Sequence, residues 1–108
     1  IEKVDKDVLL FCAGWKDRFN LEDTLFAGAV AQKITQNLRF QNISDSTIAA
    51  INMYAAAKDD MYGFLEDSSH RKRLNRLNMA EDVIYCLTLD QTDIVPVLKG
   101  DVIVSNKA

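Results

Sequence analysis

The chain is organised around one stretch of sequence, which reads VLLFCAG at residues 8–14, WKDRFN at 15–20 and LEDT at 21–24. Its first six residues are an unbroken apolar run, which predicts a strand buried on both faces of a sheet. Asn20 is a good N-cap residue with an acidic residue three positions later, so we expect a helix to begin at Leu21. The N–H groups of such a helix would face the loop at 15–20, where an anion can bind.

Helical periodicity accounts for most of the remaining chain, and the expected helices span residues 21–38, 45–67, 70–77 and 80–87. Ser68 or Ser69 is expected to cap the third of these helices, and Asn78 to end it in a left-handed conformation. Two β-branched runs around Lys99 and Gly100 are typical of a β-hairpin, with Pro96 on an edge strand. We therefore predict an α/β fold in which a mixed sheet is flanked by helices. The chain would be helix-rich, with an N-terminal buried strand and a C-terminal β-hairpin, forming a single domain over residues 1–108.

The composition is that of an ordinary globular domain, with 108 residues, 48% of them hydrophobic and 27% charged. The net charge of −3 argues against nucleic acid as a partner, because phosphate binding usually leaves a basic footprint. No segment reaches the roughly 18 to 20 apolar residues that a membrane span needs, so we expect no membrane partner. Cys12 and Cys86 both have apolar neighbours, which predicts two buried, reduced thiols in a cytoplasmic protein.

The chain opens on Ile1 rather than on methionine, and its predicted sheet is thin for the number of helices. We therefore expect it to be part of a longer protein. The missing partner strands would come from residues outside the chain or from a second copy of it in a homodimer.

Charged groups around the first predicted helix start form one candidate site. Arg18 lies in the loop, where a guanidinium can hold a phosphate bidentately or simply face solvent. Glu22 and Asp23 are the residue types that bind a hard cation such as Mg²⁺. Acidic residues in a first helical turn also stabilise the helix dipole by about 0.3–1 kcal/mol and need no other role. If Asp23 serves as part of the cap, Glu22 is the freer metal ligand.

A second candidate site lies at the start of the helix predicted at 70–77, which contains the only histidine of the chain. Such a run of cations is either a solvated helix face or an anion site, in which Ser69 and the helix N–H groups would assist. No second histidine is available for a His-based metal cluster, and no Walker, GxGxxG or EF-hand motif is present. The basic cluster comprises His70, Arg71, Lys72, Arg73 and Arg76.

Together these stretches resemble the 2-phosphosulfolactate phosphatase family. The first match is to the signature CAG…RF-x-LEDTLxAGA, carried by residues 12–14, 18–19 and 21–29. Three looser motifs follow in the same order as in the family: S-x-H-x-R-x-L around His70, D-x-x-x-C at Asp82 and Cys86, and D-x-x-x-x-VP ending at Pro96. The resemblance covers nearly the entire chain, and it is to the C-terminal half of the longer family members.

The resemblance implies hydrolysis of the phosphate ester of 2-phospho-3-sulfolactate, a phosphatase reaction that depends on Mg²⁺ and lies on the route to coenzyme M. The substrate would be a small phosphate- and sulfonate-bearing anion. The absent N-terminal half would supply part of the site, so the isolated fragment is expected to show little turnover.

Site roles follow from the same resemblance. Cys12, Glu22 and Asp23 are the expected catalytic residues, and the two carboxylates also bind the metal. A Cys12 nucleophile and a Mg²⁺-activated water are rival mechanisms, and both are chemically reasonable at a helix N-terminus. The expected substrate-binding residues are Gly14, Arg18, Ser69, His70 and Arg71.

The sequence departs from the family pattern at two positions, where Asp17 and Arg71 replace glycines that are common in the family. Two added side chains change the shape and charge of the loops around the site. They motivate an alternative function, in which the chain is a non-catalytic anion-binding or scaffold module that keeps the family fold.

Overall fold

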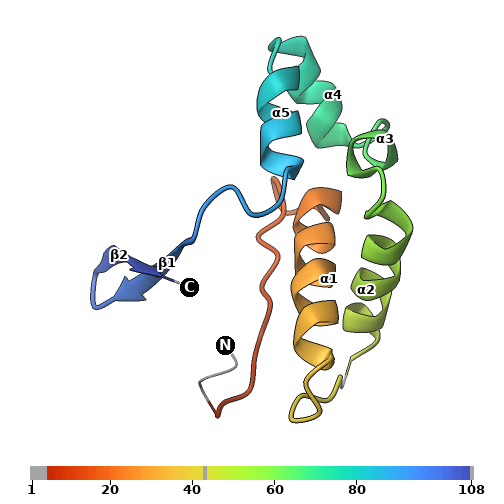
Figure 1. Ribbon diagram of the computed structural model, residues 1–108. Coiled ribbons are helices and arrows are strands. Elements are labelled where there is room, and N and C mark those ends of the chain that lie inside the picture. Colours follow the sequence, from red (N-terminus) through yellow and green to blue (C-terminus); the bar gives the residue numbers. More distant parts are fainter. Residues whose placement is uncertain (1–4, 43, 108) are drawn as a thin grey trace.

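The structure, a computed structural model, describes residues 5–42 and 44–107 (Figure 1). The opening of the chain at residues 1–4 lies outside this described part, as do residues 43 and 108. No helix in the described part combines the length and the apolar composition that crossing a membrane would require. The elements are α1 (Leu21–Thr35), α2 (Asp45–Ala57), α3 (Met61–Phe64), α4 (Ser69–Arg76), α5 (Ala80–Leu87), β1 (Ile94–Lys99) and β2 (Val102–Lys107).

The first four helices begin at polar caps, most of them where the sequence predicts, whereas α5 begins after Met79 without a side-chain cap. The side-chain oxygen of Asn20 accepts from the backbone N–H of Asp23 at 3.0 Å and starts α1. Ser68 caps α4, and Asn78, with a φ of 55°, ends that helical segment in the predicted left-handed conformation. The predicted helix at 45–67 is wrong as one unbroken helix. The side chain of Asp60 accepts from the N–H of Gly63 at 2.8 Å and starts a new turn, α3.

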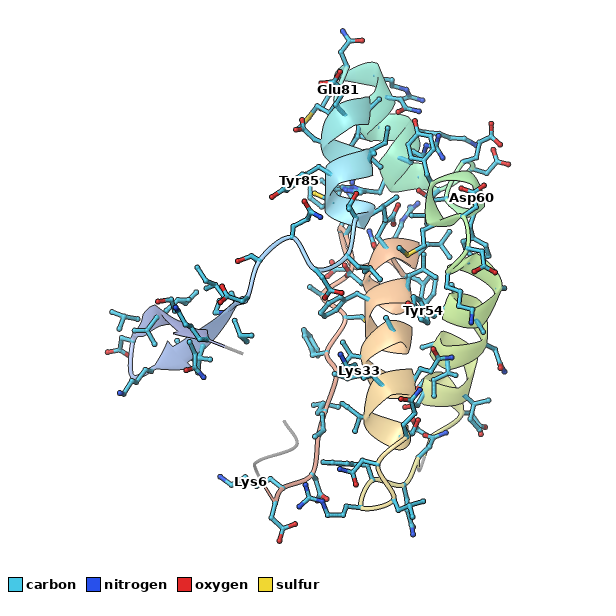
Figure 2. All side chains as sticks on the ribbon, viewed as in Figure 1. Lys6, Lys33, Tyr54, Asp60, Glu81 and Tyr85 are labelled. Carbon is cyan, nitrogen blue, oxygen red and sulfur yellow. The ribbon has the colours of Figure 1, made fainter. Side chains whose placement is uncertain are left out.

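The largest packing contact joins α1 to α2, which lie side by side and antiparallel (Figure 1). A Cβ added at Gly28 would overlap the carbonyl oxygen of Ala50 and lie 3.0 Å from the Cβ of Tyr54. Tyr54 lies between the two helices in Figure 2. Alanine side chains at Ala27 and Ala50 are buried in the same contact. The backbones of α1 and α2 can therefore come into contact at this point only because Gly28 has no side chain.

A small apolar core closes one end of the helix pair. Leu25, Ala57 and Leu65 are buried, and Leu65 is fully inaccessible to solvent. Burying a large aliphatic side chain is worth about 1.5–3 kcal/mol, so this cluster anchors α3 and α5 onto the end of the α1–α2 pair. The partly buried residues around it are Leu21, Met53, Met61 and Leu87.

The predicted N-terminal buried strand is not formed. Residues 8–13 are extended without strand pairing and run alongside α1 (Figure 1). The side chains of Leu9 and Phe11 are 86% and 84% exposed. Both cysteines are free, as expected, but Cys12 and Cys86 are exposed rather than buried. An apolar run becomes a buried strand only when neighbouring strands satisfy its backbone, and the described residues bring none to it.

The C-terminal hairpin is confirmed. β1 and β2 pair antiparallel from Ile94 opposite Lys107 to Lys99 opposite Val102, and Gly100 turns the chain with a φ of 61°. The α/β class, with helices and a C-terminal hairpin, is therefore confirmed. The arrangement of the sheet differs from the prediction. In the described part of the chain the sheet has two antiparallel strands and extends away from the helices instead of being flanked by them (Figure 1).

Gly28→Ala tests the α1–α2 contact, because helix propensity and packing predict changes of opposite sign in the free energy of unfolding. Alanine stabilises an exposed helix interior by about 1 kcal/mol relative to glycine. We expect the added methyl group to lower the free energy of unfolding by about 1–3 kcal/mol, since it overlaps the Ala50 carbonyl. Urea denaturation followed by circular dichroism measures the change. A stabilised variant would show that the helices do not approach as described.

Candidate functional site

The loop before α1 is held by the carboxylate of Asp23. The backbone N–H of Gly14 donates to its Oδ2 at 2.8 Å. Trp15 and Arg18 exchange both backbone hydrogen bonds at 3.0 Å and so close a tight turn. Within that turn Asp17 has a φ of 59°, a left-handed conformation that favours glycine. The backbone conformation explains why a glycine is suited to position 17. The hydrogen bond from Gly14 gives Asp23 a structural role in the loop.

A buried serine joins the start of α1 to the start of α4. The hydroxyl of Ser68, which is 4% exposed, donates to Oε1 of Glu22 at 2.6 Å. The Oγ atom of Ser68 also accepts from the backbone N–H of Arg71 at 3.1 Å, which is the N-cap bond of α4. One side chain thus connects two regions that lie 46 residues apart in the sequence. The two candidate sites predicted separately meet through this bond.

Arg71 is buried, with an exposed fraction of 8%. Its guanidinium lies 3.5 Å from the centroid of the Tyr62 ring, and its Nη1 donates to the carbonyl oxygen of Tyr62. Its Nε is also buried, and no described residue accepts a hydrogen bond from it. A buried donor without a partner costs about 1–3 kcal/mol, and more when the group is charged. An oxygen of an anionic ligand would remove that cost.

Glu22, His70 and Arg71 line one cavity of about 310 Å³, at the lower end of the range for small-molecule sites. Asp82 and Cys86 line it too, one helical turn apart on α5. Most of the remaining wall is apolar. The apolar lining comes from Leu25, Phe26, Ala29, Met61, Leu65, Leu74, Met79, Val83, Leu87 and Leu89, with Tyr54 beside them.

The other predicted site residues lie elsewhere. Cys12, Gly14 and Arg18 line a second cavity of about 620 Å³, between the N-terminal segment and the α1–α2 pair. Asp23 and Ser69 line neither of these two cavities. The structure therefore brings three of the eight predicted residues together on the first cavity and three on the second.

The basic cluster of α4 does not form a common patch. Lys72 forms an exposed ion pair with Asp67 at 2.9 Å, and this hydrogen bond and positive charge lower the pKa of the Asp67 carboxyl. Arg73 lies over the ring of Trp15, with 4.2 Å between the guanidinium carbon and the ring centroid. Only Arg71 and His70 of this cluster reach the first cavity.

Among the residues that the structure describes, no group of three or more His, Cys, Asp or Glu side chains is arranged to hold a metal ion. Mg²⁺ needs fewer, because it is usually held by one or two carboxylates together with waters and substrate phosphate oxygens. Glu22 and Asp82 both face the first cavity and fit that donor set. Asp23 fits it poorly, because its carboxylate accepts from Gly14 and faces neither cavity.

Four residues of this region received no site role from the sequence: Tyr62, Ser68, Asp82 and Cys86. A pattern that could have indicated Asp82 and Cys86 is their spacing of four, which places two helical residues on one face. Ser68 and Ser69 could not be separated, because either serine is a good N-cap. The contact between Tyr62 and Arg71 crosses from α3 to α4 and has no signature in the sequence.

The fold and the first cavity define a helix-rich α/β chain with a small, mostly apolar cavity that also carries Arg71, His70 and the carboxylates of Glu22 and Asp82. A family model described as 2-phosphosulpholactate phosphatase matches residues 1–101. The chain therefore belongs to the 2-phosphosulfolactate phosphatase family.

Three curated relatives are each named as a probable 2-phosphosulfolactate phosphatase. The protein from Caldanaerobacter subterraneus subsp. tengcongensis is 34% identical over 103 residues, which cover 95% of this chain and 42% of the relative. The protein from Thermotoga petrophila is 36% identical over 102 residues, covering 94% and 43%. The protein from Synechococcus sp. (strain JA-2-3B'a(2-13)) is 39% identical over 92 residues, covering 83% and 38%. The chain thus spans about two fifths of the length of these relatives.

Adjacent serines allow a matched test of the α1–α4 connection. Ser68→Ala removes a helix cap and leaves Glu22 without its donor, so we expect the free energy of unfolding to fall by about 1–3 kcal/mol. Ser69→Ala is the control, because Ser69 is exposed and should change stability by less than about 0.5 kcal/mol. Denaturant titration of both variants makes the comparison. Equal losses in the two variants would contradict the connecting role of Ser68.

Proposed function

We propose that this chain forms part of a phosphatase that hydrolyses the phosphate monoester of 2-phospho-3-sulfolactate. Membership of the family and the names of the relatives support this reaction. The observation that carries the proposal is Arg71, a buried charged side chain that lines a cavity with Glu22 and His70 and whose Nε has no hydrogen-bond partner among the described residues. A phosphate or sulfonate oxygen is the acceptor that such a donor lacks.

The residues on the cavity suit phosphoryl transfer to water. The reaction breaks the bond between phosphorus and the ester oxygen, forms a new bond from water to phosphorus, and gives the departing alkoxide a proton. Arg71 would bind the anion and offset its charge, as arginine does at phosphate sites. His70 carries the side-chain type best suited to move a proton near neutral pH.

We also propose that the reaction depends on Mg²⁺, with Glu22 as its main protein ligand and Asp82 as a second carboxylate on the cavity. When bound, the ion would offset phosphate charge and activate a water molecule. Cys12 lines the other cavity, which favours an activated water over a thiol nucleophile. Asp23 is better assigned to holding the loop at Gly14 than to the metal.

The remainder of the protein is proposed to complete the site. Full-length relatives are more than twice as long as the segment that this chain matches. The second cavity, with Arg18 and Cys12, and the exposed segment at 8–13 offer surfaces on which an N-terminal half or a second copy of the chain would pack. We accordingly expect little turnover from the isolated chain. The free thiols suit a cytoplasmic location, and the substrate suits coenzyme M synthesis.

A second candidate function is a non-catalytic anion-binding module. The observation that favours it is the engagement of Arg71, at a position where the family commonly has glycine. Its guanidinium stacks on Tyr62 and donates to the Tyr62 carbonyl oxygen, so it is already partly engaged within the chain.

Hydrolysis of 2-phospho-3-sulfolactate by the protein that contains residues 1–108, with Mg²⁺ or with a chelator, tests the proposal. Arg71→Met should lower kcat/KM by about 10- to 100-fold, because a charge-assisted hydrogen bond is worth about 1.5–3 kcal/mol. Arg76→Met is the control, since Arg76 is exposed at the end of α4 and should leave the rate unchanged.

The possible outcomes separate the two functions. Absence of hydrolysis for any phosphomonoester under both conditions would contradict the phosphatase. Saturable binding of 2-phospho-3-sulfolactate in a titration without turnover would favour the binding module instead. Equal effects of Arg71→Met and Arg76→Met would remove Arg71 from the site.

A further inference from the structure

The tight turn before α1 touches α4 through one aromatic contact. The guanidinium of Arg73 lies over the ring of Trp15, 4.2 Å from its centroid. Trp15 is the only tryptophan of the chain, and its side chain remains 49% exposed. A cation–π contact at such an exposed position is weak, so it depends on how well the cation is held in place.

His70 holds that cation. Nη2 of Arg73 and Nδ1 of His70 are hydrogen-bonded. Because arginine has five N–H donors and no acceptor, Nδ1 must be the acceptor. The bond therefore requires a neutral imidazole that carries its proton on Nε2.

Protonation of His70 would break this arrangement. Both ring nitrogens would then carry protons, so Nδ1 could no longer accept from Arg73. The imidazolium would also place a second positive charge directly beside the guanidinium. Imidazole is the side chain that ordinarily changes charge between about pH 5 and pH 8.

Charged and titratable groups on three helices lie around His70. On its own helix these are Arg71 and Arg73. From α1 and α5, the carboxylates of Glu22 and Asp82 and the thiol of Cys86 line the same cavity. Glu22 is already engaged as the acceptor of the Ser68 hydroxyl. In the loop, Lys16, Asp17 and Arg18 follow Trp15 in the sequence, and Asp17 and Arg18 line the second cavity.

We propose that Trp15, Arg73 and His70 form a proton-sensitive latch, which fastens the loop at residues 14–18 to α4 while His70 is neutral and releases it when His70 is protonated. The latch is independent of the proposed phosphatase activity, because it rests on these contacts alone. It would give the protein a loop that loosens on mild acidification beside the second cavity, which Gly14 and Arg18 line.

The single tryptophan makes the latch directly observable. Acrylamide quenching of Trp15 fluorescence should increase up to about twofold between pH 8 and pH 5, because Trp15 is only 49% exposed in the latched state. Arg73→Met should give strong quenching at both pH values. His70→Gln should give weak quenching at both, because its amide oxygen accepts from Arg73 and does not titrate. Arg76→Met should respond as the unmodified chain does.

Two measurements keep the test decisive. Subtracting the signal of Trp15→Phe isolates Trp15 emission, and far-UV circular dichroism at both pH values establishes that the helices remain folded. The proposal is overturned if quenching of the folded chain is the same at pH 8 and pH 5. It is also overturned if His70→Gln keeps the full pH response. Should His70→Gln fail to fold, an undiminished pH response in Arg73→Met would overturn it equally.

Discussion

The hydroxyl of Ser68 is the contact on which the site depends. It donates to Glu22 at the start of α1 and accepts from the backbone of Arg71 at the start of α4. Because a hydroxyl can donate and accept at once, a single buried oxygen fixes the two helix starts relative to each other. The α1–α2 pair below it, brought close by Gly28, supplies the rigid support. The Ser68 hydrogen bonds and the close α1–α2 contact together position the helices that line the first cavity.

The described site is divided in a way that bears on mechanism. Glu22, His70 and Arg71 face one cavity, whereas Cys12 and Arg18 face another. A nucleophile and a substrate-binding group on different cavities cannot act on the same phosphorus atom in this arrangement. The function proposed above uses the first cavity, because Glu22, His70 and Arg71 line it together. The second one, with the exposed segment at 8–13, is better suited to packing against further residues of the family fold.

Helix caps and turns were predictable from the sequence, whereas contacts between distant parts of the chain were not. The Asn20 cap, the left-handed Asn78 and the hairpin at Gly100 all follow from residue types within a few positions. The run at 8–13 failed as a strand, because burial requires neighbours that no local pattern supplies. The break at Asp60 was missed for a different reason, since its side-chain cap competes with an otherwise continuous helical pattern. The Arg71–Tyr62 contact depends on how α3 and α4 meet in space.

We propose that the buried Nε of Arg71 binds an anionic oxygen of the substrate. The NMR signal of that Nε–H group during titration with 2-phospho-3-sulfolactate tests this binding, with Arg76 as an internal reference. We expect a saturable shift of the Arg71 signal and a constant Arg76 signal. A shift confined to Arg18, with Arg71 unchanged at saturation, would contradict it and place the anion in the second cavity.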